Sequence, residues 1–152
     1  MKLAEALMLR ADLQKKLASL RERITHNGVV QEGDKVHEDP DALVMEAFGV
    51  IDQFEKLVFA INRANLKHKL PDGRSLTEAI ARRDTIAQEH SLLQTAIAAT
   101  QREPDRYGVR EIKWVATMDV SKLQKQSEDL AKRIRELNGR IQETNWQIEL
   151  EE

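Results

Sequence analysis

Apolar residues recur at alternating steps of three and four over four long stretches of the chain, a pattern typical of helices packed lengthwise on their neighbours. The first run shows the pattern well: Leu3, Ala6, Leu13, Leu17, Leu20 and Ile24. The spacing predicts helices at about 2–27, 40–69, 76–101 and 120–150. Each would be roughly 40 Å long at 1.5 Å per residue.

Turn and capping residues mark the ends of these helices. Asp39 and Pro40 suit the start of the second helix, because proline fits the first helical position. Pro71 to Gly73 predicts a tight turn, and Ser75 with Glu78 forms a capping box that starts the third helix at once. We therefore expect an all-α chain that folds as one domain, residues 1–152, in an antiparallel four-helix bundle.

Two longer connections, 28–39 and 102–119, separate the helices within each half of the chain. Residues 110–118 alternate, with Ile112, Trp114, Ala116 and Met118 on one side, which predicts a strand. Residues 28–31 are a candidate partner strand. We expect a small β-ribbon at one end of the bundle, and we find no internal repeat or low-complexity tract.

Composition narrows the function classes. Charged residues make up 33% and aromatic residues 4%, with 24 Lys and Arg against 26 Asp and Glu. A net charge of -2 argues against binding to duplex nucleic acid, which favours basic surfaces. The chain has no Cys, so it has no disulfide, no thiolate zinc site and no Cys nucleophile.

Membrane insertion and secretion are not expected either. The longest uninterrupted apolar run outside the N-terminal stretch, Leu57 to Ile61, is far shorter than the roughly 20 residues that a membrane helix needs. Glu5 and Arg10 interrupt the apolar run at the N-terminus too early for a secretory signal. The composition therefore predicts a soluble, cytoplasmic protein without a membrane partner.

No pattern of residues predicts catalysis. Di-iron bundles need Glu-x-x-His on two helices, and none of the four histidines has a Glu three residues before it. The six glycines are scattered and form no phosphate-binding loop. We therefore expect no metal, no cofactor and no catalytic residue, and an assignment as an enzyme is not favoured.

Polar residues on the helix seams are the candidate site. When the four helices are aligned end to end, five of them fall in or near one layer of the bundle: Arg10, Asn62, Asn65, Arg83 and Asn145. Buried charges are costly unless they are paired. Three interpretations stay open: a structural network that sets helix register, a subunit interface, and a site for a small anionic ligand.

A second candidate is an interface on the outside of the bundle. Trp146 falls off the seam of the last helix, and large aromatic residues often anchor protein contacts. The alternative for Trp146 is that it widens the core face. Gly49 and Gly139 lie inside helices, where close approach of another helix and simple tolerance of glycine explain them equally well. We therefore predict a homo-oligomer.

Several stretches also resemble a bacterial family of small helical proteins of unknown function, some members of which are labelled septicolysin. The similar stretches are 1–7, 10–15, 30–33, 61–65, 76–84, 111–117, 119–120, 123–125, 140–143 and 145–146. The septicolysin label implies a cytolysin. The sequence, however, has no secretion signal, no membrane-length segment and no Cys for thiol activation. The resemblance implies no catalytic residue.

Three functional hypotheses follow from the sequence. The first is a non-enzymatic helical module that self-associates and has a structural or interaction role. The second is an anion-binding protein or enzyme that uses a polar layer around Arg10 and Arg83. The third, which only the septicolysin label suggests, is a membrane-active protein.

Overall fold

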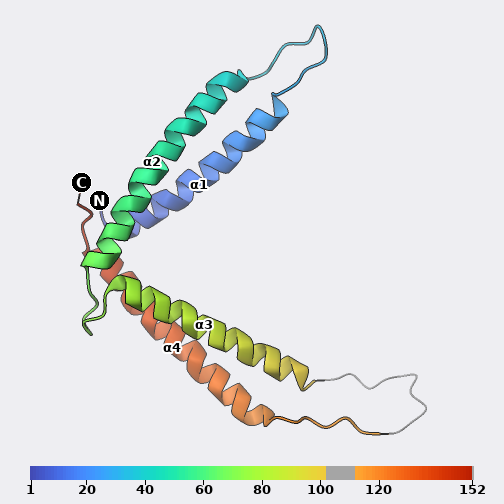
Figure 1. Ribbon diagram of the computed structural model, residues 1–152, viewed down its shortest axis with the longest axis vertical. Helices are drawn as coiled ribbons and strands as arrows, with labels where there is room; N and C mark the ends of the chain where they lie inside the picture. The colour runs from blue at the N-terminus through green and yellow to red at the C-terminus, as the bar shows by residue number, and fades with distance from the viewer. Residues whose placement is uncertain (102–111, 152) are drawn as a thin grey trace. The chain divides into compact units, whose positions relative to one another are not determined.

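The computed structural model describes residues 1–101 and 112–151, and within them the protein contains four long helices (Figure 1). In chain order they are α1 (Leu3–His26), α2 (Pro40–Lys67), α3 (Leu76–Ala99) and α4 (Val120–Gln147). Each end lies within three residues of its predicted position. The all-α prediction is therefore confirmed.

Local hydrogen bonds explain where the helices begin. The hydroxyl of Ser75 accepts from the backbone N–H of Glu78 at 3.1 Å, and the Glu78 carboxylate accepts from the Ser75 N–H at 2.7 Å. Asp39 directly precedes Pro40 and caps α2, and its carboxylate accepts a hydrogen bond from the N–H of Asp41 at 3.0 Å. These bonds satisfy N–H groups that have no partner inside a helix, which is why the caps set the boundaries.

The chain divides into two compact units. The first combines Met1–Lys69 with the chain from Gln142 onward, and the second is Leu70–Ile141. In the first unit α1 and α2 run side by side in opposite directions. Lys16 pairs with Glu46 on α2, whereas Arg23, which is further along α1, pairs with Glu38, which precedes α2. The packing of all four helices as a single bundle and a single domain stays a prediction.

The core of the first unit lies between α1 and α2. Its buried residues are Leu13, Leu20, Leu43, Ala47 and Val50, with Leu17, Ile24, Phe54 and Leu57 packed against them. On α1 these are residues of the predicted apolar run, and on α2 they recur at steps of three and four from Leu43 to Leu57. Burial of this stripe is what holds the two helices together.

The second unit is a hairpin of α3 and α4. Arg83 Nη1 donates to Asn138 Oδ1 at 3.2 Å, and Gln94 Nε2 donates to Ser127 Oγ at 2.6 Å. A step of eleven residues forward along α3 is thus a step of eleven residues back along α4. The two helices are therefore antiparallel and in register along most of their length.

The two halves of the chain repeat the same local structure. The N–H of Leu70 donates to the carbonyl of Arg74 at 2.8 Å, and the N–H of Leu150 donates to the carbonyl of Met1 at 2.9 Å. Three more backbone N–H to carbonyl bonds recur in the same way. Ala6 to Lys2 corresponds to Ala79 to Ser75, Leu43 to Asp39 corresponds to Leu123 to Asp119, and His68 to Ala64 corresponds to Ile148 to Thr144. Position 3 corresponds to 76, and position 43 to 123, since the second loop is seven residues longer.

The expectation that the chain has no internal repeat is therefore wrong. Identical residues are few, such as the buried pairs Leu3 and Leu76 and Ile61 and Ile141, and the exposed capping residues Glu5 and Glu78. The outward residues of the two halves differ in both size and charge. Because so few residues are identical, the repeat is not detectable from the sequence alone.

The predicted β-ribbon is also wrong for the residues that the structure describes. Residues 28–31 and 112–118 form no strand, and Arg110 and Glu111 lie outside the described residues. Ile112 and Val115 point to opposite sides of the expected strand, yet both are exposed. An alternating segment with neither face covered gains nothing from the extended conformation.

Candidate functional site

The five polar residues predicted to share one layer are spread over both units. Arg10 lies on α1, Asn62 and Asn65 on α2, and Asn145 near the end of α4, all in the first unit. Arg83 lies on α3 in the second unit. Within the described residues no hydrogen bond or ion pair joins any two of the five.

Partners within the second unit satisfy Arg83. Its guanidinium donates from Nε to Asp84 Oδ1 at 3.0 Å and from Nη1 to Asn138 Oδ1 at 3.2 Å. Arg10 is half-buried and makes no hydrogen bond or ion pair to any residue that the structure describes. Neither arginine lines any of the hollows described below, so the geometry does not favour the anion-site interpretation.

Asn145 is the most deeply buried of the five, with 3% of its surface exposed. Its Oδ1 accepts no hydrogen bond from the described residues. A buried amide oxygen without a donor costs about 1 to 3 kcal/mol. Asn145 occupies the position equivalent to Asn65, and Arg83 the position equivalent to Arg10, so the sequence pattern selected matching sites in the two halves.

The two ends of the chain meet in the first unit. Lys2 and Glu149 form an antiparallel bridge, and the N–H of Leu3 donates to the carbonyl of Ile148 at 2.9 Å. Glu149 also pairs with the ammonium of Lys2 at 2.7 Å and with the amino group of Met1 at 3.2 Å. Hydrogen bonds from these two cations lower the pKa of Glu149 below its ordinary value.

A second carboxylate extends this contact to α2. Lys67 pairs with the Glu151 carboxylate, and Arg63 donates to the Glu151 carbonyl at 2.6 Å. The hydrogen bond from Lys67, with the nearby charges of Lys67, Arg63 and His68, lowers the pKa of Glu151. Sequence reasoning missed this cluster, because charge pairs between chain ends have no periodic pattern.

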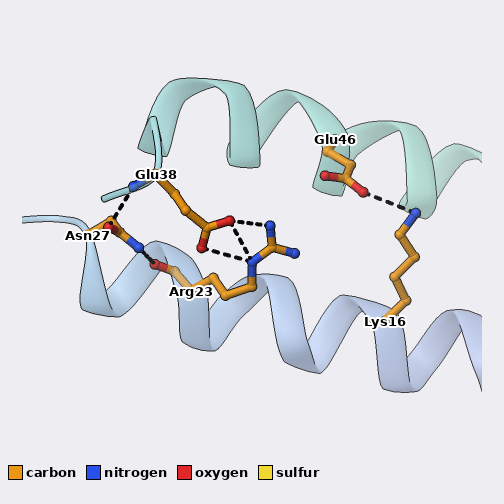
Figure 2. A network of polar contacts seen from close by, with 5 residues as sticks. All are labelled: Lys16, Arg23, Asn27, Glu38 and Glu46. Atoms are coloured by element: carbon orange, nitrogen blue, oxygen red, sulfur yellow. Dashed lines mark hydrogen bonds and ion pairs between the residues drawn. The ribbon is translucent and has the colours of Figure 1, made fainter. Parts of the chain in front are cut away.

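A third polar network anchors the loop between α1 and α2 (Figure 2). Arg23 Nε donates to both Glu38 oxygens, at 3.1 and 3.0 Å, and Nη2 makes a further contact. Asn27, which is buried, donates to the Arg23 carbonyl at 2.8 Å and accepts from the N–H of Glu38 at 3.1 Å. The Arg23 hydrogen bond lowers the pKa of Glu38 and raises the pKa of Arg23.

α2 has a second apolar side that the sequence did not predict, the outward face of α2. We use this name for five exposed apolar residues on the side away from α1: Met45, Phe48, Ile51, Phe59 and Leu66. Phe59 is 67% exposed, and the Arg63 guanidinium lies 5.9 Å from the centre of its ring. The signal was present in the sequence as a second, weaker apolar period along residues 45–66.

Each unit also carries a shallow apolar groove. The groove between α1 and α2 holds about 360 Å³ and includes Leu9, Leu13 and Leu57. The groove between α3 and α4 holds about 420 Å³ and includes Leu92, Leu93 and Leu130. Polar side chains also line both grooves, among them Gln53 and Lys56 in the first and Glu89 and Arg133 in the second.

Two sequence predictions about the outer surface have different outcomes. Trp146 is 52% exposed, and its role as an interface anchor stays a prediction. A Cβ added at Gly49 or Gly139 would meet nothing within 4 Å. Close packing within the described residues therefore does not explain these two glycines.

Over 1–101 and 112–151, no group of three or more His, Asp or Glu side chains is placed to hold a metal ion. None of the helices in these ranges is both long and apolar enough to cross a membrane.

Comparisons with other proteins indicate relatives but no activity. The model of a family of unknown function, DUF6847, matches residues 10–150. A crystal structure described as a functionally unknown conserved protein from Corynebacterium diphtheriae is 34% identical, with a TM-score of 0.93 over 99% of each chain. No curated protein matches the sequence. Neither match carries the name septicolysin, so that part of the expected resemblance is not supported.

Proposed function

This chain belongs to the DUF6847 family of unknown function, and we propose, from its own geometry, that it is a structural or interaction module that self-associates. In this proposal the protein carries out no chemistry of its own. Its role is to present helical surfaces to other copies of the same chain.

The observation that carries the proposal is the amount of large apolar surface left in contact with solvent. Met45, Phe48, Phe59 and Leu66, all on the outward face of α2, are each more than half exposed. Contiguous apolar patches are rare on soluble monomers and commonly mark contacts with other proteins. Self-association would remove this surface from water.

The alternatives have less support. For a catalytic role, the small hollow beside α2 is lined by titratable groups, among them Lys67, Glu149 and Glu151, but it holds only about 10 Å³. These groups form ion pairs that hold the chain ends, so a catalytic role has less support. A membrane-active role lacks a spanning helix in the same residues. The anion-site hypothesis retains one favourable feature, the half-buried Arg10 without a described partner.

The test is the mass of the protein in solution. Size-exclusion chromatography coupled to light scattering, over a hundredfold range of concentration, is expected to give at least twice the mass of one chain. A mass of one chain at every concentration would contradict the proposal. Thermal melts of the wild type and Arg10→Ala in phosphate and in an inert buffer address the alternative: phosphate should stabilise neither, whereas stabilisation of the wild type alone would favour an anion site.

A further inference from the structure

We propose that two copies of this chain pair through the outward face of α2, antiparallel to each other, about a two-fold axis near Glu55 and Lys56. This inference rests on the self-association proposed above, and it names the surface, the partner and the orientation. The partner is a second copy of the same chain.

The first argument is that α2 has two apolar sides. Leu43, Ala47, Val50 and Ile61 on one side are buried in the first unit. Most of the outward face lies opposite them, and Ile51, four residues after Ala47, lies at its edge. The face extends from Met45 to Leu66, 21 positions later, which is about 31 Å of helix at 1.5 Å per residue. A helix that needs to cover only one neighbour has a polar outer side, so this second stripe requires another explanation.

The second argument comes from the repeat. In α4, the positions equivalent to the outward face of α2 are Lys125, Glu128, Ala131, Gly139 and Trp146. The second hairpin therefore forms with charged or small residues at four of these five places. The apolar residues of α2 are not required by the hairpin fold, which indicates that they serve a contact outside it.

The third argument is the arrangement of charge along the stripe. Asp52 and Glu55 come first, and Lys56 and Arg63 follow. Asp52, Glu55 and Lys56 make no hydrogen bond or ion pair to the residues that the structure describes. A parallel, in-register pair would place Asp52 against Asp52, which is repulsive. An antiparallel pair reverses the order and brings carboxylates to cations, so charge complementarity favours it.

The charges also locate the axis. With the two-fold between positions 55 and 56, Asp52 of one copy faces position 59 of the other. Lys56 and Arg63 of the second copy are then each within about one helical turn of that carboxylate. Glu55 faces Lys56 directly, so each side of the axis carries opposite charges.

The same register pairs the apolar residues at the two ends. Met45 faces Leu66 of the second copy, and Phe48 lies between Phe59 and Leu66 of that copy. The contact is isologous, because each pair occurs twice. The charged centre sets orientation and register, and the apolar ends contribute the burial.

A matched pair of variants tests the surface. Leu66→Asp places a carboxylate on the outward face of α2, and Leu92→Asp places one on α3 at a leucine of equal exposure, 69% against 70%. We expect Leu66→Asp to weaken the dimer at least tenfold in light scattering. Leu92→Asp should keep the wild-type mass. Both should keep wild-type helicity by circular dichroism, because neither leucine is buried.

Disulfide trapping tests the orientation without relying on a destabilising change. The sequence contains no Cys, so an introduced one has no competitor. Glu55→Cys, next to the axis, should form a covalent dimer under mild oxidation, since a disulfide needs Cα atoms within about 7 Å. Met45→Cys alone should not, but a mixture of Met45→Cys and Leu66→Cys should give the mixed dimer.

The outcomes separate this inference from the proposed function. A wild type with the mass of one chain at all concentrations overturns both. An oligomer that Leu92→Asp dissociates and Leu66→Asp does not keeps self-association and overturns the surface. Self-crosslinking at both Met45→Cys and Leu66→Cys means a parallel pair and overturns the orientation.

Discussion

Single charged residues hold the long loop of the first hairpin in place. The Glu38 carboxylate accepts hydrogen bonds from the side chain of Arg23, and its N–H is held by the buried Asn27. Glu38 thereby joins the loop before α2 to the end of α1. Because the Arg23 hydrogen bond lowers its pKa, the ionised form of Glu38 is the one that the folded state favours.

The lowered pKa of Glu38 predicts that the contribution of this residue to folding stability is lost in acid. Stability from Glu38 is fully present above its ordinary pKa of 4.5 and is lost as the pH falls through the lower folded value, because the unfolded chain then binds more protons. We expect the melting temperature of Glu38→Gln to be below that of the wild type at pH 7. The difference should shrink as the pH approaches 3. Melts followed by circular dichroism across this range measure it.

Glu32→Gln is the matched control, since Glu32 is exposed in the same loop and makes no ion pair to any described residue. It should melt like the wild type at every pH. A constant difference between Glu38→Gln and the wild type down to pH 3 would mean that the Arg23 contact does not depend on ionisation.

The capping residues could be predicted because they bond to neighbours in the sequence. The ion pairs could not, because their partners are far apart in the chain. Ser75, Glu78 and Asp39 act on N–H groups two or three positions away, so a short stretch of sequence contains the whole interaction. Glu149 and Lys2 are at opposite ends of the chain. No spacing rule identifies such a pair before the fold is known.

At the scale of elements, the sequence predicted the helix ends correctly, but the β-ribbon that it predicted is not present in the described residues. The four helices combine caps with an apolar stripe that a neighbouring helix buries, so local and tertiary preferences agree. Residues 112–118 have the alternation of a strand, but the side chains on both sides are exposed. Alternation alone is a weak predictor, because a strand needs partners on its edges.

The repeat allows equivalent helix positions to be compared. Leu20 on α1 is fully buried in the first unit, and its equivalent on α3, Leu93, is half-buried beside the groove of the second unit. We expect Leu20→Ala to cost about 2 to 5 kcal/mol of unfolding free energy, the range for a buried Leu truncated to Ala. Leu93→Ala should cost about half of that, because less apolar area is lost.

Urea unfolding of both variants, followed by circular dichroism, measures the difference. The two changes are chemically identical and lie inside helices, so helix propensity cancels. Equal costs would show that the groove beside Leu93 is closed in solution, for example by another copy of the chain.

The candidate polar layer shows what the sequence cannot provide at the scale of the whole molecule. The seam pattern selected Arg10 with Arg83, and Asn65 with Asn145, which are equivalent positions of the two halves. Periodicity identifies such positions because it is local to each helix. It does not determine which helices share a layer, and Arg83 finds its partners, Asp84 and Asn138, inside its own unit.

The equivalence of the chain ends and the α2–α3 turn predicts that the chain tolerates circular permutation. Leu150 bonds to Met1 as Leu70 bonds to Arg74 across Pro71 to Gly73. We expect a variant in which Pro-Asp-Gly replaces residues 151–152 and joins Leu150 to Met1, and which is opened between Asp72 and Gly73, to keep wild-type helicity and mass. Opening the same joined chain between Ala47 and Phe48, inside α2, is the control and should lose both. Loss in the first variant would show that the two connections are not interchangeable.

The pairing of the two chain ends also determines the order in which the units are completed during synthesis. The second unit is one continuous segment, Leu70–Ile141, so all its contacts are available as soon as that segment has left the ribosome. The first unit needs Ile148 and Leu150 beside Met1 and Leu3, although α1 and α2 are made first. The hairpin translated first is therefore the last to be finished, and closing its long loop is an entropic step that follows synthesis of the second unit.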